Sequence, residues 1–297
     1  DIIIFQPSSG THLYIKGSNM FPVYGKLIIF ANIFFIIAID IPSLKSHEFW
    51  IEPEDYVIKI GKPLIANLRI GQNFKGDDLV FNENDFDTFT IISGNKSKKV
   101  TGRLGDRPPL NEVMDNLGLS IIVHQSKPTY LTYYDFDKFK TFSTEKGYPN
   151  IPEIHIKRGL PREGFSERYT RFAKSLVLVD KYLASDKLIG LELEFVMNTA
   201  SLSRINEPIR FKLYYKGQLY PNAHVQVFTK DIQGVVKNST YVTDLKGRIQ
   251  IKYIPNTTSL INAVVIKSID PDTNSGGAVW ESLWASTTFH TPLHNSK

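Results

Sequence analysis

The sequence contains no cysteine and no block of like charge: its 35 basic and 30 acidic residues are interspersed and leave a formal net charge of +5. Without cysteine there is no disulfide framework, no thiol nucleophile and no thiolate metal site, so any bound metal must be held by nitrogen and oxygen. Without a basic block the chain has no run of Lys and Arg side chains to bind a phosphate backbone, so we expect no nucleic-acid partner.

The motifs of common hydrolases and nucleotide-binding proteins are also missing. The sequence has no Gly-x-Ser-x-Gly elbow, no glycine-rich phosphate loop and no pair of histidines at the spacing of a zinc hydrolase. Aromatic residues make up 12% of the chain and charged residues 22%, which is typical of a globular protein. We therefore expect a folded protein that is not an enzyme.

One apolar stretch stands out near the start of the chain. Residues 27–39 follow Lys26, are interrupted only by Asn32, and end at Asp40. The stretch is shorter than the roughly 20 residues that span a membrane and lies within the roughly 7–15 of a signal-peptide core. We predict a signal peptide over residues 20–46. The chain would then contact the membrane only through this peptide, during export.

The expected cleavage site follows Ser46, a small residue, although Leu44 is larger than the residue usually found at its position. Cleavage there makes His47 the mature N-terminus of a periplasmic protein in a Gram-negative bacterium. The alternative is a buried hydrophobic helix or an uncleaved anchor. Residues 1–19 precede the first Met and are interpreted as upstream or disordered sequence. No later apolar run reaches spanning length, so we do not expect a permease.

After the signal, short alternating segments are separated by turn residues, a pattern typical of β-strands. Two segments have helical spacing instead: residues 136–146, where phenylalanines recur, and residues 166–176, where Ser166 can cap the first turn. On the second predicted helix three cations would share one side and could meet an anion, although a solvated helix face is the plainer interpretation; they are Arg168, Arg171 and Lys174.

These patterns predict a mostly β fold with two β-sandwich, immunoglobulin-like domains and short helical insertions in the first. The first domain is expected over residues 47–200, the second over 201–292, and a tail over 293–297. The string from Gly217 to Gly247 resembles the transthyretin-like or collagen-adhesin B-type immunoglobulin-like module, which implies a sandwich that serves as a spacer, stalk or binding module.

The candidate metal ligands are histidines. If cleavage follows Ser46, His47 carries a free α-amine and an imidazole that together chelate a divalent transition metal such as nickel or cobalt, and copper or zinc are compatible. His124, at the end of an apolar strand, and His155 are the further candidates. Each also has a plain interpretation as a packed or exposed histidine. The remaining histidines after the signal are interpreted as structural or solvated.

Several strings resemble a bacterial periplasmic family of unknown function that is grouped with cobalt and nickel uptake, over nearly all of residues 47–290. They begin at His47, Arg69, Gly102, Arg158, Glu167 and Trp280. The resemblance implies that an N-terminal histidine helps to bind the metal, a role that falls on His47. The leading hypothesis is therefore a periplasmic nickel- or cobalt-binding protein that delivers metal to an inner-membrane importer.

Two alternatives remain open. The first is an envelope structural or interaction protein that binds glycan or protein through its immunoglobulin-like module, with Trp280 and Trp284 as a stacking surface. In a sandwich strand, however, two such tryptophans are more often core. The second is a copper site built on His47 that activates oxygen.

Overall fold

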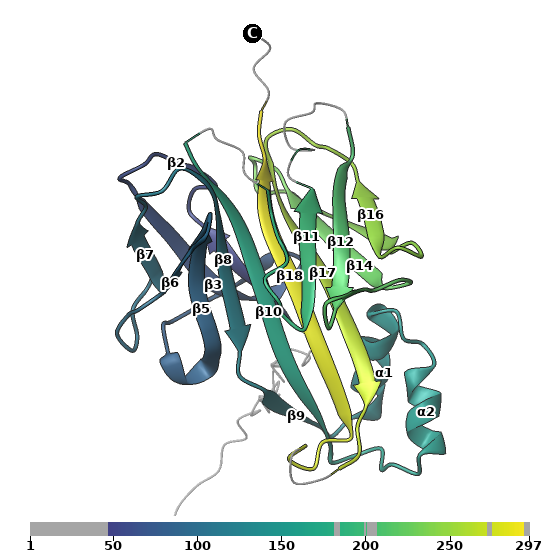
Figure 1. Cartoon of the computed structure of the whole chain (residues 1–297). Coiled ribbons are helices and arrows are strands. Elements are labelled where there is room, and N and C mark those ends of the chain that lie inside the picture. The colour runs from purple at the N-terminus through teal and green to yellow at the C-terminus, as the bar shows by residue number, and fades with distance from the viewer. Residues whose placement is uncertain (1–46, 181–184, 199, 201–206, 272–274, 294–297) are drawn as a thin grey trace, which may run out of the picture. The chain divides into compact units, whose positions relative to one another are not determined.

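The computed structural model describes residues 47–180, 185–198, 200, 207–271 and 275–293. The predicted signal peptide and the segment before it lie outside these residues, as does most of the predicted tail. The described residues belong to one compact unit. The predicted fold class, mostly β with sandwiches and short helical insertions, is confirmed (Figure 1). No helix among the described residues is both long and apolar enough to cross a membrane.

A ten-stranded sheet forms the centre of the molecule, and its strands come from both sides of residue 200. Two long strands in its middle, β10 and β18, run parallel from the pair Glu167 and Trp280 to the pair Ser175 and Thr288. In order the sheet contains β15 (Val236–Val242), β14 (His224–Lys230), β17 (Thr257–Ser268), β18 (Trp280–Thr291), β10 (Phe165–Val179), β8 (Gly118–Ser126), β5 (Phe86–Ser93) and β6 (Lys96–Lys99), with β2 (Val57–Ile58) and β9 (Thr129–Tyr133) paired to β10.

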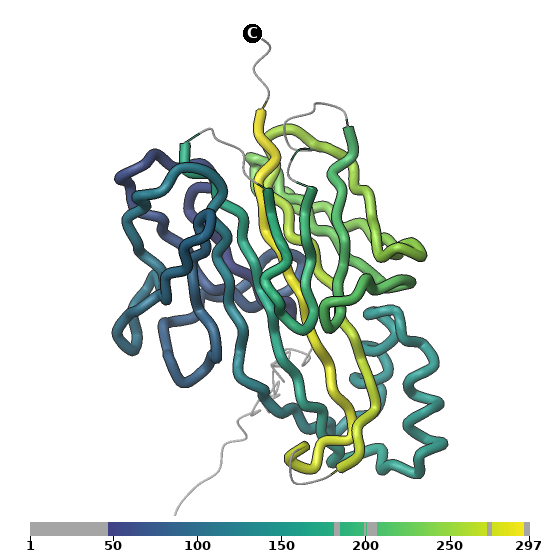
Figure 2. Tube along the Cα trace, in the orientation of Figure 1, coloured from purple at the N-terminus to yellow at the C-terminus, as the bar shows by residue number. Residues whose placement is uncertain are grey.

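Two smaller sheets pack against the large one. We call them sheet A and sheet C; Figure 2 shows the chain path through both. Sheet A contains β1 (Glu48–Pro53), β3 (Pro63–Gln72), β4 (Lys75–Leu79) and β7 (Leu110–Val113). Sheet C contains β11 (Leu193–Asn198), β12 (Ile209–Tyr215), β13 (Gln218–Leu219) and β16 (Arg248–Ile251).

Strands β8 and β10 are shared by two cores because side chains alternate across a strand. On β8, Leu119, Ile121 and Val123 pack with sheet C, whereas Ile122 packs with sheet A. On β10, Phe172 and Leu176 join the sheet C core, and Ala173 and Val177 join the sheet A core. The large sheet is therefore the middle layer of two sandwiches, and both faces of its central strands are buried.

The helical insertion covers one end of β17 and β18. It contains α1 (Phe136–Glu145) and α2 (Ile151–Lys157). A 3₁₀ turn, η1 (Glu83–Asp85), lies before β5. The predicted helix at 136–146 is confirmed as α1, which begins after Asp135, whose side chain accepts a hydrogen bond from the backbone N–H of Asp137. Trp280 and Trp284 are buried beneath this insertion, so they form core and not a sugar-stacking surface.

The predicted helix at 166–176 is wrong, because this segment is part of the 15-residue strand β10. The three cations do not share a helix face. Arg168 and Lys174 lie on one side of the strand and Arg171 on the other. Lys174 is buried, and its ammonium group donates to Asp186 at 2.9 Å and to Glu194 at 3.0 Å.

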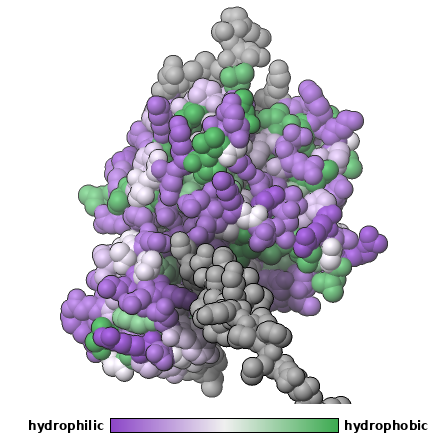
Figure 3. Space-filling model, turned by 180° about the vertical axis from the view of Figure 1, so that it is seen from behind, coloured by the Kyte–Doolittle hydropathy of each residue, from purple (hydrophilic) through white to green (hydrophobic). Residues whose placement is uncertain are grey.

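Seen from behind, hydrophilic residues cover most of the surface and hydrophobic ones are scattered among them (Figure 3). This is the ordinary surface of a globular protein.

Candidate functional site

His124 lies on β8 with its side chain in the sheet A sandwich, where it is 4% exposed. Its ring packs among aromatic rings, with centroids 4.9 Å from Phe49, 5.4 Å from Phe86 and 5.3 Å from Phe89. Burial, together with the positive charge of Arg171, lowers the pKa of His124 to about 3. The ring is therefore neutral at ordinary pH, and its Nδ1 atom has no hydrogen-bond partner among the described residues.

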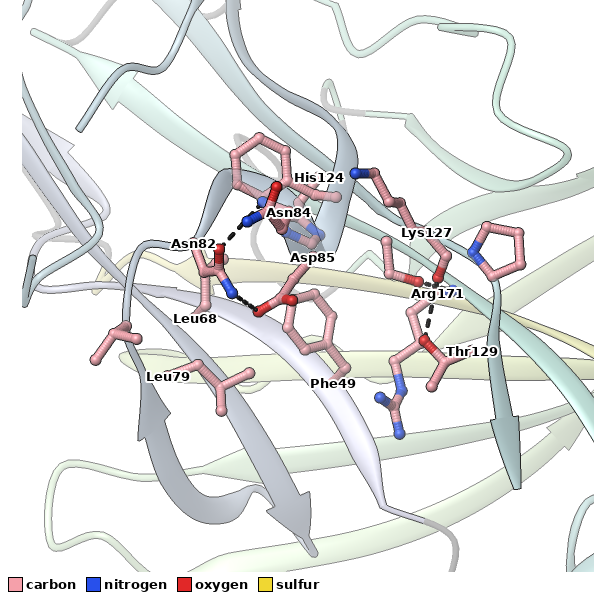
Figure 4. A pocket seen from close by; sticks show the side chains of 14 residues that line it. Phe49, Leu68, Leu79, Asn82, Asn84, Asp85, His124, Lys127, Thr129 and Arg171 are labelled. Carbon is pink, nitrogen blue, oxygen red and sulfur yellow. Dashed lines mark hydrogen bonds between the residues drawn. The ribbon is translucent and has the colours of Figure 1, made fainter. Parts of the chain in front are cut away.

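A pocket of about 480 Å³ lies next to this histidine. Side chains from β1, β3, β8 and β10 and from the turn before β5 converge on it (Figure 4). The apolar lining is formed by Phe49, Leu68, Leu79, Val80, Phe86 and Pro128, and the polar lining by Asn82, Asn84, Asp85, His124, Ser126, Lys127, Thr129 and Arg171.

Arg171 enters the pocket from β10. Its guanidinium carbon lies 4.6 Å from the centroid of the Tyr169 ring, and its Nη2 atom donates to the backbone oxygen of His47 at 3.4 Å. The Nε atom is buried and has no hydrogen-bond partner in the part of the chain that the structure describes. Burial lowers the pKa of Arg171, although a guanidinium stays charged at any ordinary pH.

His47 is exposed and comes directly before β1. Its backbone binds Arg171, and Phe49, two residues later, packs against His124. The structure thus places the start of β1 beside the His124 pocket.

His155 lies elsewhere, on α2 within the helical insertion, and is fully buried. Its Nδ1 atom accepts a hydrogen bond from the indole Nε1 of Trp280 at 2.9 Å, so its Nε2 atom carries the proton and donates to the backbone oxygen of Pro161 at 2.9 Å. Burial lowers the pKa of His155. Both ring nitrogens are engaged, so a metal ion at this ring would have to displace one of these partners.

No group of three or more histidine, aspartate or glutamate side chains that could hold a metal ion occurs within the described ranges. Of the sequence-predicted ligands, His47 and His124 lie in one region and His155 in another. His224 and His290 lie on β14 and β18, and burial lowers the pKa of each. His294 lies outside the described residues.

A second hollow, of about 390 Å³, lies on the outer face of sheet C. On β12 the inward side chains are apolar and the outward ones include Arg210 and Lys212. The paired strand β16 places Gln250 opposite Arg210 and Arg248 opposite Lys212. This sheet C face therefore presents three cationic side chains, among which Lys212 and Arg248 are direct cross-strand neighbours.

Two of these three cations form an ion pair with an acidic neighbour. The guanidinium of Arg248 binds Asp244 at 2.8 Å, and Arg210 binds Glu207 at 3.3 Å. Side chains from β11 and from the end of β12, including Asn198 and Tyr214, complete the hollow.

The profile of a family described as a domain of unknown function, DUF4198, matches residues 44–266. The chain belongs to the DUF4198 family. The match confirms that the chain resembles a family of unknown function, and the grouping with nickel and cobalt uptake stays a prediction. No curated protein matches the sequence of this DUF4198 protein.

Two solved structures resemble the DUF4198 chain weakly. One is a tetra-tandem repeat in the extending region of a large adhesion protein, at 10% identity and a TM-score of 0.22 over 82% of this chain and 49% of that one. The other is the D0–D1 domain of Intimin, at 14% identity and a TM-score of 0.20 over 82% of this chain and 97% of that one. The chain spans about half the length of the first.

Sequence reasoning missed two features of the DUF4198 protein. Arg171 was placed on a helix, so its position beside His124 was not expected. The cationic sheet C face was not singled out, although the alternation of apolar and charged residues from Ile209 to Tyr215 is the signal that would have found it.

Proposed function

We propose that this DUF4198 protein is a non-enzymatic interaction protein of the bacterial envelope, exported to the periplasm, that binds an acidic glycan through the sheet C face. The observation that carries the proposal is the cross-strand pair of Lys212 and Arg248, with Arg210 two residues away on the same face. Like charges directly opposite on a sheet destabilise it; Asp244 offsets part of that cost at Arg248, and an anionic partner would offset more of it.

The chemistry of the face favours a carboxylate- or phosphate-bearing chain. Guanidinium groups bind such groups through paired hydrogen bonds, and an ammonium group adds a point charge. The sheet backbone is already ordered, so binding costs little backbone entropy. The entropy that is lost on binding is that of the long cationic side chains. The same charges could meet an acidic protein, which is the competing outcome of the test.

Binding to polygalacturonate, an acidic glycan probe, tests the proposal by isothermal titration, with neutral dextran as the control ligand. We expect polygalacturonate to bind and dextran not to bind. The double variant Lys212→Gln, Arg248→Gln should weaken binding about ten-fold or more, since each charge-assisted contact is worth on the order of 1 kcal/mol. The matched control Lys237→Gln changes an exposed cation on the edge strand β15 and should leave binding unchanged.

A loss of binding free energy in Lys237→Gln of half or more of the loss in the double variant would contradict the proposal, because binding would then depend only on the number of charges removed. Binding of dextran as tight as that of polygalacturonate would also contradict it. Binding of acidic proteins with no binding of either glycan would replace the glycan with a protein partner.

A second candidate function is delivery of nickel or cobalt to an inner-membrane importer, with the metal as cargo. The specific observation in its favour is that neutral His124, the protonation state that ligates metals, has an Nδ1 atom without a partner among the described residues, and that its ring packs against Phe49 of β1. The free α-amine and imidazole of a mature His47 would supply the other donors. Arg171 in the same pocket opposes this function, since it repels a cation.

Titration of nickel into the chain that begins at His47 tests this candidate, with the same chain extended by one alanine ahead of His47 as the control. We expect a dissociation constant below about 10 µM for the first chain and about ten-fold weaker binding for the second. Equal affinity of the two chains would exclude the chelating amine.

A further inference from the structure

The pocket beside β1 contains two buried polar atoms without partners among the described residues, His124 Nδ1 and Arg171 Nε. An unpartnered buried polar atom costs on the order of 1–3 kcal/mol. Other such atoms occur among the described residues, for example Trp50 Nε1 and Asn262 Oδ1, but their residues do not line this pocket. His124 and Arg171 both line it. A ligand that accepts hydrogen bonds from both would remove both costs.

Of the described charged residues that line the pocket, Arg171 is the one that is not exposed, and it is a cation. The two acids whose charge acts on Arg171 have other partners: Glu167 accepts hydrogen bonds from Tyr133 and Ser282, and the Oε1 atom of Glu48 pairs with Lys146 at 3.1 Å. The Oε2 atom of Glu48 has no hydrogen-bond partner among the described residues. Within the described part of the chain, the Arg171 guanidinium lies over the Tyr169 ring, interacts with the Tyr169 hydroxyl group and donates to the backbone oxygen of His47, and it forms no ion pair with a carboxylate.

The other charged groups that line the pocket lie at its exposed side. Lys127 adds a second positive charge there. Asp85 is the acid among the described lining residues, and its Oδ2 atom accepts a hydrogen bond from Asn82 at 2.9 Å. The interior of the pocket thus presents one guanidinium and one neutral imidazole.

The remaining wall is apolar. Phe49 and Phe86 supply aromatic rings, and Leu68 and Leu79 supply aliphatic surface on sheet A. A volume of about 480 Å³ falls in the range of small-molecule pockets, which are mostly apolar with a few placed polar groups. A bare inorganic ion would leave this apolar surface uncovered.

We propose that this pocket binds a small organic carboxylate, with the carboxylate on Arg171 and on the Nδ1–H of His124 and the apolar body against Phe49 and the sheet A leucines. A guanidinium matches the geometry of a carboxylate, and a neutral imidazole in its Nδ1–H tautomer donates one further hydrogen bond. The site is separate from the sheet C face and goes beyond the glycan-binding function.

The test uses phenylacetate as the probe and phenylacetamide as its neutral analogue of the same shape, titrated into the full chain in the presence of a metal chelator. We expect phenylacetate to bind about ten-fold or more tightly than phenylacetamide. Inorganic phosphate should compete only weakly, because it has no apolar body. Equal affinity for acid and amide, or full displacement by phosphate at the same concentration, would overturn the proposal.

Variants locate the site. Arg171→Gln should weaken phenylacetate binding about ten-fold, whereas Arg171→Lys, which keeps the charge, should lose less. The control Arg103→Gln changes a cation whose side chain is 92% exposed and should bind as the parent does. The sheet C double variant should also bind phenylacetate normally, which separates this site from the glycan face.

A measurement on the unaltered protein does not depend on the folding of any variant. The ring resonances of His124 should shift when phenylacetate is added, with the shift saturating at the affinity measured by titration. An unchanged His124 resonance at about 20 mM phenylacetate would overturn the proposal.

Discussion

Buried polar residues of this protein are of two kinds, those with full sets of partners and those without. Lys174 is the clearest case of the first kind, because its ammonium group donates to Asp186, to Glu194 and to the backbone oxygens of Phe195 and Lys187. These contacts tie β10 to the segment that leads into β11. His124 and Arg171 are of the second kind, and they lie at the pocket.

The first prediction at the residue scale concerns Lys174. Lys174→Met leaves two buried carboxylates without their cation, so we expect the free energy of unfolding to fall by about 3–5 kcal/mol. Urea denaturation measures the loss. The control Lys59→Met removes the charge of a side chain that is 73% exposed, and it should lower the free energy of unfolding by about 0.5 kcal/mol or less. A loss of the same size in both variants would show that the buried network contributes nothing.

The second prediction concerns His124. Burial, and secondly Arg171, lowers its pKa to about 3 in the folded state, against about 6.5 in the unfolded chain. Between these values the unfolded state binds more protons, so this histidine's contribution to stability is complete above about pH 6.5 and is lost as the pH falls, by up to about 1.4 kcal/mol per pH unit.

Replacement of this ring checks the prediction. His124→Phe keeps a flat ring among its aromatic neighbours and should flatten the pH dependence of the unfolding free energy between about pH 6 and pH 4.5. The exposed His47→Asn variant serves as the control and should keep the slope of the parent. An unchanged slope in His124→Phe would mean that the ring is not desolvated in solution.

At the scale of elements, the sequence predicted strands well where one face is polar. The segments around β3, β5, β12 and β14 alternate, and the structure forms strands there. Strand β10 was mistaken for a helix because both of its faces are buried, so the alternation disappears, and cations at spacings of three imitate a helical face.

The candidate sites were predictable only in part. His124 could be placed on a strand, and Arg171 could not be placed beside it, because that requires the pairing of β8 with β10 across more than 40 residues. The parallel pairing of β10 with β18 joins residues more than 100 positions apart, which no local pattern encodes.

One element gives a direct test of local structure. Asp135 caps α1 through its hydrogen bond to the N–H of Asp137 at 2.9 Å. Asp135→Ala should lower the free energy of unfolding by about 1 kcal/mol, whereas Asp135→Ser, which can still cap the helix, should restore most of it. Chemical denaturation measures both, and equal stability of the two variants would rule out the cap.

At the scale of the whole molecule, the shared sheet joins the two sandwiches into one body. Ile122 faces the sheet A core, and its neighbours Ile121 and Val123 face the sheet C core. Loss of order in either sandwich therefore removes packing from the other. We expect a single unfolding transition, with calorimetric and van't Hoff enthalpies that agree.

The variant Ile122→Ala sharpens this expectation. It should lower the one transition, with a cost of about 2–5 kcal/mol, and should not split it into two. Differential scanning calorimetry distinguishes the outcomes. Two separate transitions, of which only one moves in the variant, would show that the sandwiches unfold independently.

The central functional claim, that the sheet C face binds anionic partners by charge, is tested most directly by the salt dependence of polygalacturonate binding. Each ionic contact contributes about one unit to the slope of log K against log salt concentration. We expect Lys212→Gln, Arg248→Gln to lower the magnitude of this slope by about two and Lys237→Gln to leave it unchanged. A slope that is the same in all three proteins would contradict the claim.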